Sequence, residues 1–148
     1  MSVLVANCHY VGTRILIPFQ LSNLVPEGQF GHTSLIWEGQ IDTGFDGYIM
    51  MPFSFAQRNN LQLASSLGEW TAANGQSMST INTVGKVIIV GTAAFAVINS
   101  PIDQNSGSSI LIDQKILEAW GLKLEADSLN KIAQLVIPDP PQQNQTNP

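Results

Sequence analysis

One short segment of this chain, residues 41–47, combines acidic, hydroxyl and glycine residues in the way that a reactive site requires, and it reads Ile-Asp-Thr-Gly-Phe-Asp-Gly. It holds the only Asp-Thr-Gly in the 148 residues. Asp42 follows an apolar stretch, so it should lie at or below the surface, where burial raises the pKa of a carboxylate unless a partner compensates. Thr43 can supply a hydroxyl, and Gly44 lets backbone N–H groups and a ligand approach because it has no Cβ. The segment therefore predicts a reactive acid held in a fixed place.

Two structural alternatives compete with this interpretation. Asp, Thr and Gly are common turn residues, so the triplet alone is also typical of an ordinary turn. Asp42, Gly44, Asp46 and Gly47 also occupy the first, third, fifth and sixth positions of an EF-hand-like loop. Gly44 offers no side-chain ligand at the third position, however, and Phe53 stands at the twelfth, where the loop needs a bidentate Glu. We therefore expect no calcium site.

Other candidate residues are weaker. Cys8 and His9 are adjacent, but His32 is the only other histidine and no carboxylate follows at ligand spacing. We expect no metal ion and no cofactor. The tryptophans should be core or interface anchors, because no basic residues interleave with them. They are Trp37, Trp70 and Trp120.

The composition limits the classes of fold and partner. Hydrophobic residues make up 44% of the chain and charged residues 11%, and 12 glycines and 8 prolines separate many short apolar runs. This pattern predicts one mainly β domain. Six Lys and Arg against eleven Asp and Glu give a net charge of −5 with no basic cluster, so nucleic acid is not an expected partner.

The termini and the single cysteine bear on location. Cys8 alone cannot form an internal disulfide, which suits a reducing compartment, and we expect a cytoplasmic protein. Residues 1–10 lack the basic stretch of an export signal, and the apolar run 15–19 is too short to span a bilayer. No membrane is expected as a partner. Residues 138–148, rich in Pro, Gln and Asn, should form a disordered tail.

The reactive acid needs a frame of strands, and the apolar runs predict one. A strand over residues 33–41 would deliver Asp42, after an irregular start over residues 1–13. Pro52 would end the next short strand, and residues 53–59 would form one or two helical turns. The predicted strands are residues 14–21, 33–41, 48–51, 69–73, 76–83, 86–90, 93–98, 109–112, 122–126 and 132–137.

A hairpin is predicted around Asn74-Gly75, after a connecting segment over residues 61–66. Both residues of this dipeptide tolerate the positive φ of a tight turn. The tip carries small and polar side chains, including Ala73. With so little to bury, the hairpin would project and move, although an ordinary surface hairpin explains the same residues.

The period of the pattern changes after the strand over residues 109–112. Asp113 can cap a helix over residues 114–120, and Gly121 suits the end of that helix. This unit is a strand followed at once by a helix.

These features, in this order, resemble the retropepsin-like aspartic peptidases, the single-lobed family of the retroviral proteases and stand-alone prokaryotic relatives. The matches are the strand ending in Asp42-Thr43-Gly44, the strand over residues 48–51, the hairpin at Asn74-Gly75 and the strand-helix unit over residues 110–122. The resemblance covers residues 14–126. It implies a retropepsin-like closed β-barrel with one short C-terminal helix and a flap hairpin, in a domain over residues 14–137 between an N-terminal extension and the tail.

The resemblance also implies an aspartic endopeptidase. Hydrolysis of an amide by this route needs two carboxylates around one water. The chain has no second Asp-Thr-Gly or Asp-Ser-Gly, because Leu129 follows Asp127-Ser128, so the second carboxylate must come from another copy. The implied active form is a homodimer with one Asp42 from each chain, and the pair should favour acidic to near-neutral pH.

The implied roles of the other residues surround this pair. Thr43 would bond across the two-fold axis and fix the catalytic loops, and Gly44 would complete the catalytic triplet and line the cleft. An extended peptide or protein substrate would add as a strand in the cleft, beneath the flap. The residues implied in its binding are Gly44, Asp46, Ala73, Asn74 and Gly75.

One departure from the family concerns Asp113, which stands where the late motif normally has a glycine. A Cβ and a charge there could shift the catalytic loop, or Asp113 could cap the helix and point to solvent. Asp113 therefore leaves a second function open, a catalytically inactive dimerisation or peptide-binding module on the same fold. An unrelated small β-barrel that binds a ligand would fit the strands but not the ordered motifs.

Overall fold

The protein is mainly β with two short helices in a computed structural model, which describes residues 3–42, 49–64, 68–71, 75, 77–89, 91–101 and 109–138. The strands are β1 Val3–Val11, β2 Arg14–Ser22, β3 Ser34–Asp42, β4 Ile49–Met50, β5 Gln62–Leu63, β6 Gly68–Thr71, β7 Ser77–Ile89, β8 Thr92–Pro101, β9 Leu111–Asp113, β10 Lys123–Asp127 and β11 Ile132–Ile137. The helices are α1 Phe53–Arg58 and α2 Gln114–Ala119. None of the described helices is long and apolar enough to cross a membrane.

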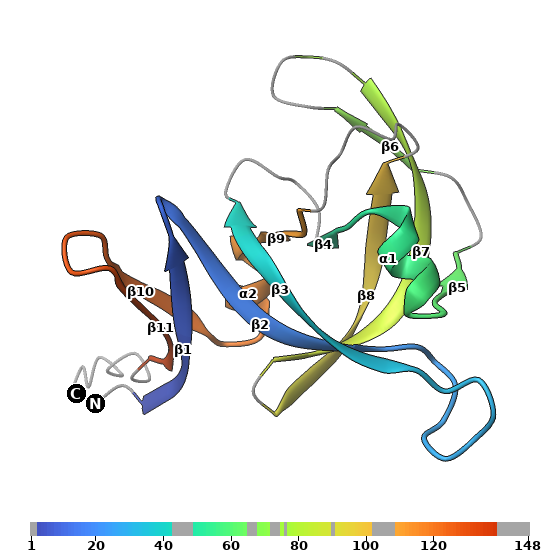
Figure 1. The fold of residues 1–148 in the computed structure, drawn as a ribbon, viewed down its shortest axis with the longest axis horizontal. Helices are drawn as coiled ribbons and strands as arrows, with labels where there is room; N and C mark the ends of the chain where they lie inside the picture. The colour runs from blue at the N-terminus through green and yellow to red at the C-terminus, as the bar shows by residue number, and fades with distance from the viewer. Residues whose placement is uncertain are drawn as a thin grey trace, which may run out of the picture.

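The strands close a ring, in the order β2, β3, β9, β4, β8, β7 and back to β2 (Figure 1). β3 pairs with β9 in parallel and β4 with β8 in parallel, whereas the other neighbours in the ring are antiparallel. From β2 the sheet continues outward through β1 and β11 to β10. The ring is therefore one part of the sheet, and the strands near the two termini form the other.

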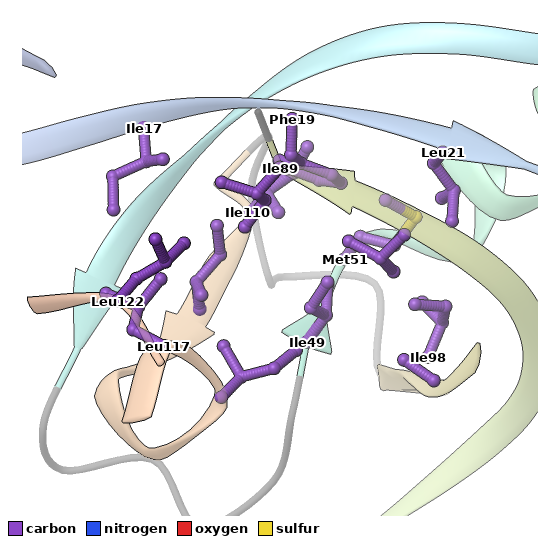
Figure 2. Close-up of a cluster of buried hydrophobic side chains, with 14 of the residues drawn as sticks. Ile17, Phe19, Leu21, Ile49, Met51, Ile89, Ile98, Ile110, Leu117 and Leu122 are labelled. Atoms are coloured by element: carbon purple, nitrogen blue, oxygen red, sulfur yellow. The ribbon is translucent and has the colours of Figure 1, made fainter. Parts of the chain in front are cut away.

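The core lies inside the ring, where alternate residues of the long strands β2, β7 and β8 are buried. On β2, Ile17, Phe19 and Leu21 are all buried while Gln20 is exposed, the two-residue period of a half-buried strand. Figure 2 shows these side chains meeting others from β4, β7, β8 and the end of α2. The buried hydrophobic cluster is Ile17, Phe19, Leu21, Ile49, Met51, Ala56, Val87, Ile89, Ala96, Ile98, Ile110, Ile112, Ile116, Leu117, Leu122 and Leu135.

The predicted mainly β class is confirmed, as are most of the predicted strands and both helical segments. One strand, β7, covers the two that were predicted over residues 76–83 and 86–90. Gly85 lies within β7, where this strand approaches β2 closely. A Cβ on Gly85 would lie 2.8 Å from Leu21 Cδ1 and 3.2 Å from the backbone oxygen of Ser22, so the close approach requires a glycine.

The prediction of an irregular start was wrong, because β1 pairs with β11 on one side and β2 on the other. Five of its nine residues are exposed and the other four are half-buried, so its sequence does not have the apolar pattern of a core strand. The segment over residues 61–66, predicted as a connection, contains the short strand β5 against β7. The predicted tail lies outside the described residues except for Pro138.

Candidate functional site

Asp42 is the last residue of β3, one residue beyond the predicted end of the strand, and β3 lies between β2 and β9. In the parallel pairing with β9, Ile41 stands beside Ile112 and Asp42 beside Asp113. The Gln40 N–H donates to the Ile110 carbonyl at 2.7 Å at the start of this pairing. Two strands from distant parts of the chain thus end together at the candidate site.

Gly39 makes the close approach of β3 and β9 feasible. A Cβ at this position would lie 2.5 Å from Ile112 Cδ1 and 2.7 Å from Ile112 Cγ1. Because Ile112 is fully buried, it has little room to move away. Gly39 was not among the predicted site residues, although an isolated glycine inside a strand often marks the close approach of another element.

Three isoleucines form a platform at the ends of these strands. Ile49 on β4 pairs with Ile112 on one side and with Ile98 on the other, and none of the three is exposed. Figure 2 shows Ile49 and Ile98 among the buried side chains next to Met51. The strand that ends at Asp42 is therefore held against the buried core through its pairing with β9.

Asp113 is the charged residue that the structure places beside the predicted acid. It ends β9 directly before α2 and its side chain is only 3% exposed. The interpretation that Asp113 points to solvent was therefore wrong. Adjacent strands lie about 4.8 Å apart, so the backbones of Asp42 and Asp113 are neighbours at the same end of the sheet.

Several predicted site residues lie outside the described residues. Of the acidic segment, the backbone of Asp42 is described, but Thr43, Gly44 and Asp46 are not. Of the hairpin tip, Ala73 and Asn74 are not described, whereas Gly75 is. Gly75 has a φ of +84°, the positive value predicted for this turn, and the space around its missing Cβ is open to 4 Å.

The predicted hairpin is present as β6 and the start of β7, which pair from Gly68 opposite Thr80 to Thr71 opposite Ser77. Within the described part of the chain, β6 pairs with no other strand. Figure 1 shows this hairpin standing out from the ring on the same side as the carboxyl end of β3. Its motion remains a prediction.

Two hollows flank β3. One of about 180 Å³ is next to the candidate site and is lined by Gln40 and Glu38 of β3. Arg14, Leu16, Ser109 and Ile110 complete its wall. Another of about 350 Å³ includes Ser34, at the opposite end of β3. Asp42 lies eight positions after Ser34 along the strand, about 26 Å away, so this second hollow is not part of the site.

Trp37 and Trp120 pack against the core, as predicted, whereas the side chain of Trp70 is not described. Trp37 donates from Nε1 to Asn59 Oδ1 at 2.7 Å, and its ring lies 4.7 Å from that of Phe55. The fully buried Asn59 also donates from Nδ2 to the Leu21 carbonyl at 2.9 Å. Asn59 thus ties β2 and β3 to the end of α1.

Cys8 is not suited to be a nucleophile. Burial raises the pKa of its thiol from 9.0 to about 11, against a smaller opposite effect of a hydrogen bond with the Leu135 backbone. Only a thiolate attacks efficiently. Within the described ranges, no group of three or more His, Cys, Asp or Glu could hold a metal ion.

Comparisons with protein-family models, with curated proteins and with solved structures found no match to this chain.

Proposed function

We propose that the protein is an aspartic endopeptidase that works as a homodimer, with Asp42 of each chain activating one water to hydrolyse an extended peptide. The observation that carries this proposal is the position of Asp42. It ends a central strand of the ring, in register with the end of β9 and directly beside the start of α2. The fold proposed with this function is the closed retropepsin-like barrel with a flap.

The mechanism needs two carboxylates in different protonation states. The ionised carboxylate takes a proton from the water while the protonated one polarises the scissile carbonyl. Each chain would contribute Asp42 near a two-fold axis, where two like charges do not ionise independently. Gly39 and the isoleucine platform support the proposal because they hold the backbone of Asp42 against the core.

The substrate would bind as an added strand under the β6–β7 hairpin. A hairpin with only two strands and an exposed Gly75 near its tip can bend over a peptide at low cost. Main-chain hydrogen bonds would hold the peptide, and its alternate side chains would be read on either side. Closure of the hairpin would exclude water other than the nucleophile.

A second candidate is a catalytically inactive module that dimerises or binds peptides. The observation that favours it is the buried Asp113 beside Asp42, in the position where the resembled family keeps a glycine. An additional acid at this place could prevent the pair of Asp42 residues from reaching the geometry or the protonation needed for catalysis.

Digestion of a peptide library from acidic to neutral pH would decide between the two. The peptidase predicts cleavage by the wild type and none by Asp42→Asn, which keeps the size of the side chain. Asp113→Gly, tested alongside, would show whether this aspartate limits activity. Absence of cleavage by folded, dimeric wild-type protein at every pH would refute the peptidase.

A further inference from the structure

The outermost strand of the sheet, β10, has one edge that is not paired with another described strand. β10 pairs with β11 from Lys123 opposite Val136 to Asp127 opposite Ile132. On its other side, no strand follows in the part of the chain that the structure describes. Figure 1 shows β10 at one extremity of the molecule, next to β11 and β1. The backbone N–H and C=O groups of such an edge can pair with a strand of another chain.

The sequence of this edge is complementary to itself. If two copies of β10 run antiparallel with Leu124 opposite Leu124, Lys123 of each chain faces Glu125 of the other. The same register sets Leu124 opposite its own copy, so apolar residues also meet at the axis. Opposite charges directly across a pair of strands stabilise it, and like charges destabilise it.

The neighbouring registers are less favourable. With Glu125 at the centre, Lys123 would face Asp127, but the two Glu125 carboxylates would face each other across the axis. A shift of one residue would put Leu124 opposite Glu125 and mix the two faces of the sheet. A lysine on an edge strand usually prevents pairing. Here Glu125 supplies the opposite charge for Lys123 in one register.

The two faces of β10 also suit a continued sheet. Lys123 and Glu125 are exposed on one face, where their charges can pair in solvent. On the other face, Leu124 packs against the core. A hollow of about 290 Å³ between α2 and β10, lined in part by Leu117, Leu122 and Leu124, adjoins that apolar face. A second β10 would extend this apolar face across the edge.

We infer that β10 pairs antiparallel with β10 of a second copy of this chain, with Leu124 at the two-fold axis. The evidence for this pairing is the unpaired side and the sequence of β10. The role of the dimer in a peptidase depends in addition on the proposed function. A closed dimer has one two-fold axis, so the same axis would relate the two Asp42 residues. The paired edges are short compared with a standard interface, and we expect reversible, concentration-dependent association.

Sedimentation of the full chain over a range of concentrations tests the inference by charge reversal. Lys123→Glu and Glu125→Lys each put like charges at both contacts and should weaken the dimer at least about tenfold. The double variant Lys123→Glu/Glu125→Lys restores both opposite-charge contacts and should restore the dimer. Lys86→Glu and Glu27→Lys make the same changes of net charge at exposed positions away from the edge, and they should leave it unchanged.

A monomeric wild type, single variants that remain dimeric, or a double variant that stays dissociated would each overturn the inference. Peptide cleavage measured on the same samples separates it from the proposed function. A Lys123→Glu variant that still dimerises and cleaves would refute the edge and leave the peptidase. The wild type could also respond to the charge reversals as expected and yet cleave no peptide. This result would support the pairing of β10 and refute the proposed peptidase function.

Discussion

At the scale of single residues, Cys8 gives the protein a measurable dependence on alkaline pH. Its thiol has a pKa of about 11 in the folded chain because burial disfavours the thiolate, against 9.0 as the ordinary value. The unfolded chain therefore loses this proton at lower pH than the folded chain. The stabilisation is fully present below about pH 9 and is lost as pH rises through about 11.

Cys8→Ala should remove this part of the pH dependence. The free energy of unfolding of the wild type should fall more steeply than that of Cys8→Ala between pH 9 and pH 11, and the two curves should run parallel below pH 8. Urea unfolding at a series of pH values measures both. Parallel curves over the whole range would mean that the thiol is not shielded from water.

Asp113 allows a prediction about the reaction itself. Asp113 lies beside Asp42 in the pairing of β3 with β9, and a negative charge at this place would oppose the ionisation of the two Asp42 residues. In Asp113→Asn, which keeps the size of the side chain, both limbs of the pH–rate profile for peptide cleavage should therefore move to lower pH, by about one unit. A profile that keeps its position in Asp113→Asn would show that the charge of Asp113 does not reach the catalytic pair.

At the scale of elements, the contact between β3 and β9 depends on Gly39. Gly39→Ala places a Cβ within 2.7 Å of two atoms of the buried Ile112, so we expect a loss of about 1–3 kcal/mol in the free energy of unfolding. Denaturant unfolding measures the loss. In an Ile112→Ala background the colliding atoms are absent, and the same substitution should cost much less. An equal cost in both backgrounds would place the effect elsewhere.

The elements themselves were largely predictable from the sequence, because their signals are local. β2 alternates with period two, and Gly121, with a φ of +70°, follows the predicted helix as expected. The neighbours of each element were not predictable. Asp42 and Asp113 are adjacent through a parallel pairing of strands far apart in the chain, and no local pattern specifies such a register. For the same reason β1 was not predicted as a strand, because it is paired with β11 from the other end of the chain.

The candidate site was predictable only in part, for a similar reason. The Asp-Thr-Gly triplet identified Asp42, and the apolar run before it predicted the strand that it ends. Gly39 gave a weaker signal, because a single glycine in a strand has several causes. The burial of Asp113 could not be predicted, since a residue before a helix is commonly a solvent-exposed cap.

At the scale of the whole molecule, the proposed peptidase requires two chains, because each supplies a single Asp42 in an Asp-Thr-Gly triplet. Mixing wild type with Asp42→Asn tests this requirement. If chains exchange freely, an equal mixture contains about one quarter wild-type dimers, so cleavage should fall to about half that of the same wild type alone. A ninefold excess of the variant should reduce it to about one tenth.

The mixing experiment also distinguishes two possible catalytic pairs. One consists of Asp42 from each of two chains, and the other of Asp42 and Asp113 of the same chain. If Asp113 supplied the second carboxylate to Asp42 of its own chain, each wild-type chain would keep its activity in any mixture, and cleavage would not change. The comparison is Lys123→Glu/Asp42→Asn, which adds the same amount of protein but turns one of the two charge contacts with a wild-type chain into a contact of like charges, so it should enter wild-type dimers less readily. Cleavage that falls further with Asp42→Asn than with this double variant would assign one carboxylate to each chain.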